Sequence, residues 1–161
     1  MKKVTKRKIF QFRAKLAVGL WRDFEIDGSD TLEELATAIL AAYQFDCDHC
    51  YGFYSKIKGN KSESEEVYEL FADLEDGSYI KHAKGVYETI IDDVFSPKKQ
   101  MLFFFDYGDS WEFILTCKDI VQPEEGVRYP RTTGSKGDAP KQYPPIPEWR
   151  TTFPNASSGF L

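Results

Sequence analysis

Two short segments of the sequence carry residue types that could do chemistry. Asp46, Asp48 and His49 fall within four positions, and Asp106 and Asp109 lie close together further along the chain. Two or more carboxylates with an imidazole form a ligand set that suits Mn²⁺, Mg²⁺ or Fe²⁺. One hypothesis is therefore a metal-dependent hydrolase that acts on phosphate esters.

The same aspartates also have a structural interpretation. Asp106 and Asp109 flank Gly108, and carboxylates in such turns bond the backbone N–H groups of their own loop, while Asp48 can cap the turn after a helix. Trp111 is explained by packing as well as by ligand stacking. Both interpretations stay open at this point. The candidate functional cluster consists of Asp48, His49, Asp106, Asp109 and Trp111.

The three cysteines give only weak evidence for a metal or redox site. Cys47 and Cys50 have the spacing of one end of a zinc knuckle, but a closed site needs four ligands, and only Cys117 and His82 remain to complete it. Their odd number argues against a disulfide framework, so we predict reduced thiols without stoichiometric zinc. His49 could act as a general base, but no nucleophile motif accompanies it. No catalytic residue and no cofactor is therefore assigned.

Apolar patterning predicts the elements that must position these residues. Two segments alternate apolar and polar side chains, which is typical of half-buried strands joined as a hairpin. Asp30 or Thr31, followed three residues later by Glu33 or Glu34, forms a capping-box signature, and apolar residues then recur at helical spacing. The first half of the chain is thus expected to hold strands over 10–18 and 21–26, a helix over 31–44, and strands over 51–57 and 67–74.

The second half is expected to add one helix and one hairpin. Thr89 with Asp92 can cap a short helix through Phe95, which Pro97 ends. Two aromatic-rich runs, 101–105 and 111–117, flank the Asp106 turn and predict the hairpin. The strand over 51–57 should pair antiparallel with the first of these runs. Such pairing sets Tyr51 opposite Phe105 and brings His49 within reach of Asp106 or Asp109.

The end of the chain reads as an extended segment. Seven of the eight prolines follow Val121, so residues 122–161 are expected to wrap over the sheet with Tyr143, Trp149 and Phe153 as buried aromatic anchors. The whole chain, 1–161, is expected to form a single domain with a basic amino-terminal arm over residues 1–8.

Charge and hydropathy narrow the classes of partner. The formal charge is −5, and an acidic middle segment follows the basic arm, so binding to duplex DNA is disfavoured although not excluded. No apolar run is long enough to cross a membrane and no signal core is present, which predicts a soluble, cytoplasmic protein without a membrane partner. The acidic middle consists of Glu63, Glu65, Glu66, Glu69, Asp73, Glu75 and Asp76.

Several motifs, in this order, resemble the pRiA plasmid ORF-three-like family. They are Leu20-Trp21-Arg22, the helix end at Ala42 to Phe45, Asp48-His49, and the loop from Phe105 to Glu112. The resemblance covers about Ile9 to Pro145, and it implies an α+β architecture and an association with plasmids or mobile elements. It implies no activity. Members of that family often have a histidine where this chain has Phe113, and a Pro-Pro-Glu-Asp element where this chain has Ala139 to Pro145.

These observations combine into one predicted architecture and three functional hypotheses. We expect an α+β fold with a mixed, mainly antiparallel sheet, two helices, a β-grasp-like core of hairpin, helix and strands, and the extended proline-rich carboxyl-terminal segment. The favoured function is a non-enzymatic interaction or accessory module with a protein partner of unknown identity. The alternatives are the metal-dependent hydrolase and a nucleic-acid-binding accessory protein.

Overall fold

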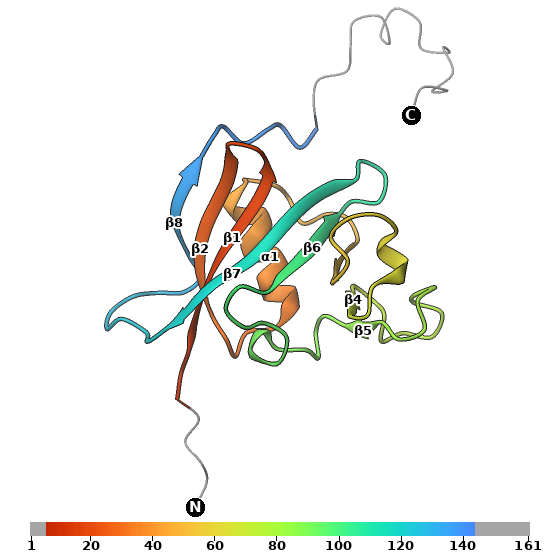
Figure 1. The fold of residues 1–161 in the computed structure, drawn as a ribbon, viewed down its shortest axis with the longest axis horizontal. Coiled ribbons are helices and arrows are strands. Elements are labelled where there is room, and N and C mark those ends of the chain that lie inside the picture. The colour runs from red at the N-terminus through yellow and green to blue at the C-terminus, as the bar shows by residue number, and fades with distance from the viewer. Residues whose placement is uncertain (1–5, 144–161) are drawn as a thin grey trace, which may run out of the picture.

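One mixed sheet of eight strands forms the body of the protein. The computed structural model describes residues 6–143, and its sheet has the order β5-β4-β3-β6-β7-β1-β2-β8 (Figure 1). All neighbouring strands pair antiparallel except β4 and β5, which are parallel. The strands are β1 (Ile9–Ala17), β2 (Leu20–Asp27), β3 (Tyr51–Tyr54), β4 (Val67–Glu69), β5 (Lys84–Gly85), β6 (Gln100–Phe105), β7 (Trp111–Val121) and β8 (Arg131–Lys136).

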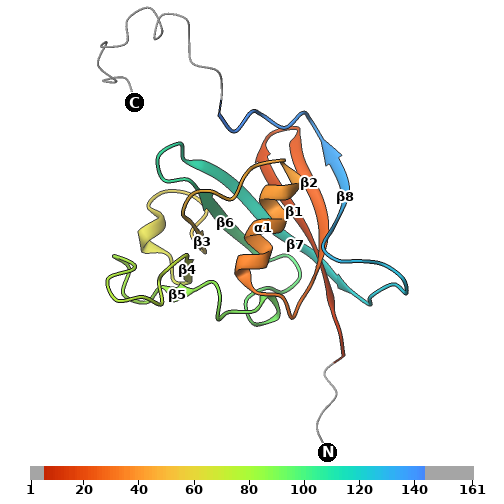
Figure 2. The same ribbon diagram turned by 180° about the vertical axis from the view of Figure 1, so that it is seen from behind.

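The one α-helix among residues 6–143, α1 (Leu32–Ala42), covers one face of the sheet (Figure 2). Thr31 caps it as the sequence predicts: the Thr31 hydroxyl accepts from the Glu34 N–H at 3.2 Å, and the Glu34 carboxylate accepts from the Thr31 N–H at 2.8 Å. Its apolar side packs on alternate residues of the strands below it. The buried core includes Phe10, Phe12, Phe24, Leu35, Ile39, Phe53, Phe103, Phe113 and Leu115.

The predictions of a second helix and of a β-grasp-like core are wrong. Residues 89–95 contain only the 3₁₀ turn Ile91–Asp93, because Thr89 does not cap a helix: its hydroxyl donates to the Gly85 carbonyl at 2.9 Å. Ile90 forms an isolated β-bridge with Thr31, the residue that immediately precedes α1. Seven residues make too short a helix to form without tertiary support, and here the tertiary contacts favour extended backbone. The α+β class is correct, but one helix lies on an eight-stranded sheet.

The carboxyl-terminal segment contributes an edge strand that the sequence pattern does not show. β8 pairs antiparallel with β2, with Lys136 opposite Trp21, and only Arg131 and Gly134 among its residues are even partly buried. An edge strand with little apolar burial lacks the alternation on which strand prediction relies. Two of the proposed aromatic anchors, Trp149 and Phe153, lie outside the described residues.

The second face of the sheet carries a smaller apolar cluster at the end with β3, β4 and β6. Tyr54, Val67, Leu102 and Phe104 are buried there, and the segment between β4 and β5 covers them with Ile80 and Ala83. This segment is the structure's most irregular connection. Among residues 6–143, no helix is long and apolar enough to cross a membrane.

Candidate functional site

The two segments singled out for their chemistry lie side by side at one end of the sheet. Tyr51 pairs with Phe105 in antiparallel register, which confirms the predicted pairing of their strands. His49 precedes Tyr51 and Asp106 follows Phe105, so the two side chains emerge together. The distance from His49 Nδ1 to Asp106 Oδ2 is 3.6 Å. The sequence therefore located this juxtaposition correctly.

Three acceptors surround one nitrogen of the His49 ring. Nδ1 lies 2.8 Å from Asp48 Oδ1 and 3.0 Å from the Tyr143 hydroxyl, in addition to the Asp106 carboxylate. The hydrogen bond with Asp48 and the charge of Asp106 raise the pKa of His49. Hydrogen bonds from Tyr143 and His49 lower the pKa of Asp48. The neighbouring carboxylates thus stabilise the protonated imidazole, which donates to Asp48 from Nδ1.

Asp106 serves both the turn and the imidazole. Its backbone has a φ of 61°, and its Oδ1 accepts from the N–H groups of Gly108 at 3.0 Å and Asp109 at 3.2 Å. Aspartate tolerates this left-handed conformation because its short side chain can bond locally. The other carboxylate oxygen faces His49. The turn-capping interpretation of Asp106 is thus observed, together with a contact to His49, whereas the Asp109 side chain is exposed on the turn.

Two residues that sequence reasoning did not place here complete the cluster. The Gln142 side chain accepts from the Asp46 N–H at 2.7 Å and donates to the Asp46 carbonyl at 2.9 Å. Tyr143 donates to Asp48 Oδ2 at 2.6 Å. Tyr143 is 49% exposed, so it anchors the carboxyl-terminal segment by polar contact and not by the burial that was predicted.

Trp111 lies behind the cluster and packs on the core. Its ring meets that of Phe45 edge-on at 4.9 Å, and among residues 6–143 its buried indole N–H has no hydrogen-bond partner. An open hollow beside it is lined by Asp109, Lys141 and Gln142. Phe113, on the strand that follows Trp111, is fully buried in the core.

The cysteines do not converge with the acidic side chains. Cys117 is buried in the core, whereas Cys47 and Cys50 are exposed in the loop before β3. Within residues 6–143, no three His, Cys, Asp or Glu side chains are arranged to hold a metal ion. Desolvation and the nearby carboxylates of Glu33 and Asp48 raise the pKa of the Cys47 thiol, which disfavours its thiolate form.

Two adjoining hollows, of about 430 Å³ and about 540 Å³, open beside the cluster and share Cys50, Leu70 and Phe71. Together we call them the groove. The first hollow is lined chiefly by Tyr54, Lys61, Glu69, Tyr79 and Tyr107. The second is lined chiefly by Glu33, Cys47, Asp48, His49 and Tyr87. The His49 cluster is thus one wall of a larger concave surface.

Phe71 stands between the two hollows in an unusual backbone conformation. Its φ is 69°, a left-handed value that is rare for a bulky aromatic residue, and its side chain is 46% exposed. The following turn is tight: Leu74 N–H donates to the Phe71 carbonyl at 3.0 Å, and a Cβ on Gly77 would lie 1.8 Å from that same oxygen. The chain therefore holds Phe71 outward at a cost in backbone strain, which is typical of functional surfaces.

The segment that forms much of the groove is strongly acidic. Residues 61–88 contain eight acidic and three basic residues, a net charge of −5 that equals the formal charge of the whole chain. Most of these carboxylates are exposed, including Asp73, Glu75, Asp76 and Glu88. The remainder of the protein is electrically balanced, so its long-range field is centred on this segment.

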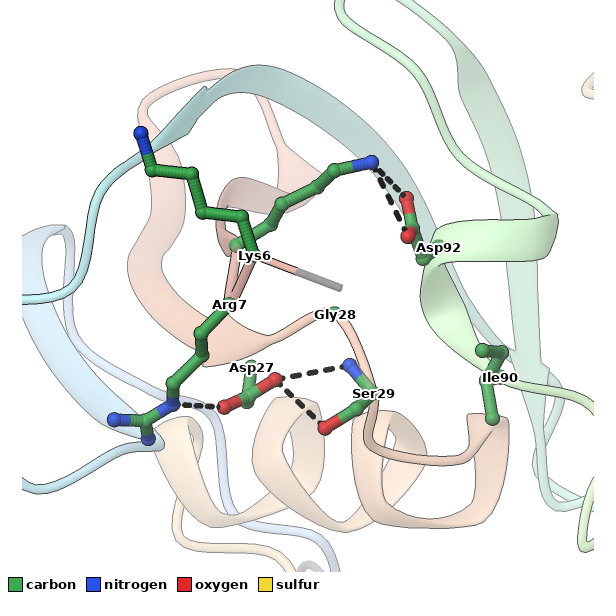
Figure 3. Close-up of a pocket in the computed structure, with 8 residues that line it drawn as sticks. Lys6, Arg7, Asp27, Gly28, Ser29, Ile90 and Asp92 are labelled. Carbon is green, nitrogen blue, oxygen red and sulfur yellow. Dashed lines mark hydrogen bonds and ion pairs between the residues drawn. The ribbon is translucent and has the colours of Figure 1, made fainter. Parts of the chain in front are cut away.

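The basic arm is tied down at the opposite end of the sheet, in the part that the structure describes. Arg7 pairs with Asp27, whose carboxylate also accepts from the Ser29 N–H and hydroxyl, and Lys8 Nζ lies 3.1 Å from Asp92 Oδ1 (Figure 3). Hydrogen bonds from Arg7 and Ser29 lower the pKa of Asp27 against the effect of burial. The hollow between them, about 210 Å³, is thus bounded by two ion pairs and by Lys6.

The electrostatics of the cluster predict how His49 titrates. Its pKa should lie above the ordinary 6.5 and should fall toward that value in Asp48→Asn, with a smaller decrease in Asp109→Asn. NMR titration of the imidazole signals between pH 4 and 9 gives the pKa of His49 in the wild type and in each variant. The signal that is missing in His49→Gln is the one that belongs to His49. A wild-type pKa at or below 6.5 would contradict the geometry. These contacts are expected to stabilise the protein fully between pH 3.8, the ordinary pKa of Asp48, and pH 6.5, the ordinary pKa of His49. The stabilisation is lost as the pH rises through the raised pKa of His49, and also as the pH falls through the lowered pKa of Asp48.

Comparisons with known proteins agree with this fold. A family model described as plasmid pRiA4b ORF-3-like protein matches residues 8–143. The crystal structure of a protein of unknown function from Methanosarcina mazei Go1 is similar, with a TM-score of 0.66 and 21% sequence identity over 83% of this chain and 72% of that one. At this identity the likeness concerns the fold. No curated protein gives a significant match.

Proposed function

The chain belongs to the family of plasmid pRiA4b ORF-3-like proteins, and for this member we propose a binding function: the groove recognises a basic segment of a partner protein. This proposal keeps the interaction module that the sequence favours. It adds a surface and a chemistry for the partner. The site consists of the two hollows and the apolar side chains that project around them.

The observation that carries the proposal is the gathering of exposed aromatic and aliphatic side chains around an acidic groove. Among residues 6–143, seven large apolar side chains are exposed. Four of them line the groove, and two more, Leu74 and Tyr143, are hydrogen-bonded to residues that line it. Soluble proteins rarely expose such groups together unless they bind something, and tyrosine is enriched among residues that dominate interface energies. The four that line it are Phe71, Tyr79, Tyr87 and Tyr107.

Charge complementarity supports a basic partner. Lysine or arginine side chains on the partner would face the carboxylates of residues 61–88, while its apolar side chains would pack around Phe71. Complementary potentials raise association rates and exclude acidic competitors. The partner is therefore expected to be a short segment that combines basic and apolar residues.

The two alternative hypotheses receive less support from the site. A hydrolytic role for His49 has little geometric support: among residues 6–143, no serine, threonine or cysteine side chain bonds the imidazole, and no three His, Cys, Asp or Glu side chains are arranged to hold a metal ion. A nucleic-acid role sits poorly with an acidic groove, because phosphates would meet like charge there. Neither hypothesis uses the exposed aromatic groups.

A peptide screen tests the proposal. On an array of short random peptides, the protein should enrich sequences that contain both lysine or arginine and apolar residues. Binding of the best peptide, measured by calorimetry, should weaken about ten-fold or more in the double variant Leu74→Ser/Tyr79→Ser, which removes exposed contacts without disturbing the core. Raising the salt from about 0.05 M to 0.3 M should also weaken it, because the Debye length shortens.

Val18→Ser is the matched control. Val18 is 93% exposed at the turn between β1 and β2, away from the groove, and its loss should leave binding unchanged. An equal effect of Val18→Ser, or enrichment of acidic peptides, would count against the groove as the binding surface.

A further inference from the structure

Three aromatic rings lie near the ammonium group of Lys61: Tyr54 and Tyr107 line the first hollow, and Phe104 is buried beside them. The Lys61 Nζ lies 4.2 Å from the centroid of the Phe104 ring and 6.0 Å from the centroids of both Tyr54 and Tyr107. Each distance falls within the range over which a cation is attracted to the negative face of an aromatic ring. We call these three rings the aromatic seat.

Neighbouring strands build the aromatic seat on the second face of the sheet. Phe104 comes from β6 and Tyr54 from β3, and Phe104 packs against Tyr107 of the following turn with centroids 5.2 Å apart. Gly52 lies opposite Phe104 in the register, and a Cβ there would come within 2.7 Å of the Tyr54 hydroxyl. The absence of a side chain at Gly52 therefore gives the Tyr54 ring its place.

The carboxylate of Glu69 fixes the two tyrosines and places a negative charge beside the seat, which favours cations. Both the Tyr54 and the Tyr107 hydroxyls donate to Glu69 Oε2, the latter at 3.3 Å, and the hydroxyls lie 2.8 Å from one another. Ser78 donates to the other oxygen of Glu69. The rings are thus held by a negative charge within the hollow. Burial raises the pKa of both hydroxyls, so they stay neutral donors at physiological pH.

The contacts of Lys61 mark it as a replaceable occupant. Lys61 begins the 3₁₀ turn Lys61–Glu63, in a loop held by other residues: Asn60 accepts from the Ser62 N–H and hydroxyl, and Lys56 pairs with Glu63. Among residues 6–143, no carboxylate lies within ion-pair distance of the Lys61 ammonium. Its ammonium can leave the seat while the loop that carries it stays in place.

We infer that the aromatic seat is a recognition site for a lysine ammonium group of the partner, and that Lys61 occupies it until the partner's side chain displaces it. This inference rests on the proposed function, because the cation is taken to arrive on the basic segment that the groove binds. Lys61 then acts as an internal competitor. It protects the aromatic faces from water in the unbound protein and lowers the apparent affinity for weak cations.

A small cation tests the seat without the rest of the groove. Tetramethylammonium chloride should shift the NMR signals of the Tyr54, Phe104 and Tyr107 rings, with sodium chloride at equal ionic strength as the blank. Removing the competitor in Lys61→Ala should strengthen this binding about five-fold or more. Lys84→Ala is the matched control, because Lys84 is exposed in the same acidic segment but does not contact the rings, and it should leave the affinity nearly unchanged.

Each result decides the inference. Weaker or unchanged binding in Lys61→Ala, or an equal gain in Lys84→Ala, would overturn it, and Lys61→Gln gives the same readout if the alanine variant does not fold. Adding Tyr107→Leu to Lys61→Ala should abolish the response.

If the basic peptide binds the groove while tetramethylammonium does not bind the rings, the seat fails and the proposed function stands. If the cation binds and no basic peptide does, the proposed function fails and the seat remains a bare cation site, which overturns its assignment to a partner's lysine.

Discussion

Replacement of Arg22 with alanine is expected to lower the free energy of unfolding by about 3 kcal/mol, measured by urea denaturation. Arg22 is 8% exposed on the helix-covered face of β2. Its Nε donates to the Ala42 carbonyl at 3.2 Å, and its Nη1 donates to the carbonyls of Trp21 at 2.9 Å and Lys136 at 3.1 Å. One side chain thus caps the end of α1 and joins it to β2 and β8, and its loss removes a buried donor from three carbonyls at once.

A second arginine serves as the control for this prediction. Arg13 lies on the solvent face of the neighbouring strand, where it pairs with Asp23 at 2.7 Å and stacks on the Trp21 ring at 3.6 Å. Arg13→Ala should cost about 1 kcal/mol or less, because the pair is partly exposed and screened. Arg22→Lys should fall between, since a single ammonium cannot reach carbonyls on two sides. If Arg22→Ala costs no more than Arg13→Ala, the bridging role assigned to Arg22 is wrong.

Two substitutions at Asp106 should separate its structural from its electrostatic role. Asp106→Ala is expected to destabilise the protein by about 2 kcal/mol, because it removes two backbone hydrogen bonds and places alanine at a positive φ. Asp106→Asn keeps an acceptor oxygen and tolerates that conformation, so its cost should stay below about 1 kcal/mol. Because it also removes a negative charge beside the imidazole, it should lower the pKa of His49.

Thermal or urea denaturation measures the loss of stability, and NMR titration measures the change in the pKa of His49. The two readouts should diverge in Asp106→Asn: near-native stability with a clearly lower pKa of His49. Equal loss of stability in both variants would show that the negative charge holds the turn, and an unchanged pKa in Asp106→Asn would remove Asp106 from the cluster.

Local signals in the sequence account for the parts of the fold that were predicted correctly. The alternation in β1 and β2, the capping box of α1 and the aromatic hairpin of β6 and β7 are each specified by residues within a few positions of one another. The pairing of Tyr51 with Phe105 was also predicted, because each residue precedes a polar turn that must emerge from a buried strand. That one register was enough to bring His49 to Asp106.

Other parts depend on contacts that no local pattern encodes. Thr89 and Asp92 have the spacing of a helix start, but the bridge between Ile90 and Thr31 competes successfully for this segment. β8 is held by backbone pairing with β2 and shows no apolar stripe. Gln142 and Tyr143 reach Asp46 and Asp48 from about 95 positions away, and glutamine and tyrosine in a proline-rich segment give no sign of such a contact.

The surface around Phe71 illustrates a second reason why sequence reasoning stopped short. Phe71, Leu74 and Tyr79 look like core residues by type, and only their measured exposure distinguishes them from the buried aromatic groups nearby. The acidic residues between them were recognised as an acidic segment. Their arrangement beside a groove became visible only with the coordinates.

The central place of β1 sets the timing with which this protein can assemble during synthesis. β1 lies between β2 and β7, and the residues of β1 are about 100 positions away in the chain from the residues of β7 with which they pair. At typical translation rates, roughly 5–20 s pass between the emergence of β1 and that of β7. During that interval Phe12 can pack on Phe24 and Phe95, but β1 has no partner along its second edge. A nascent chain stopped before Trp111 would thus expose an unpaired central strand edge, a natural target for a ribosome-associated chaperone.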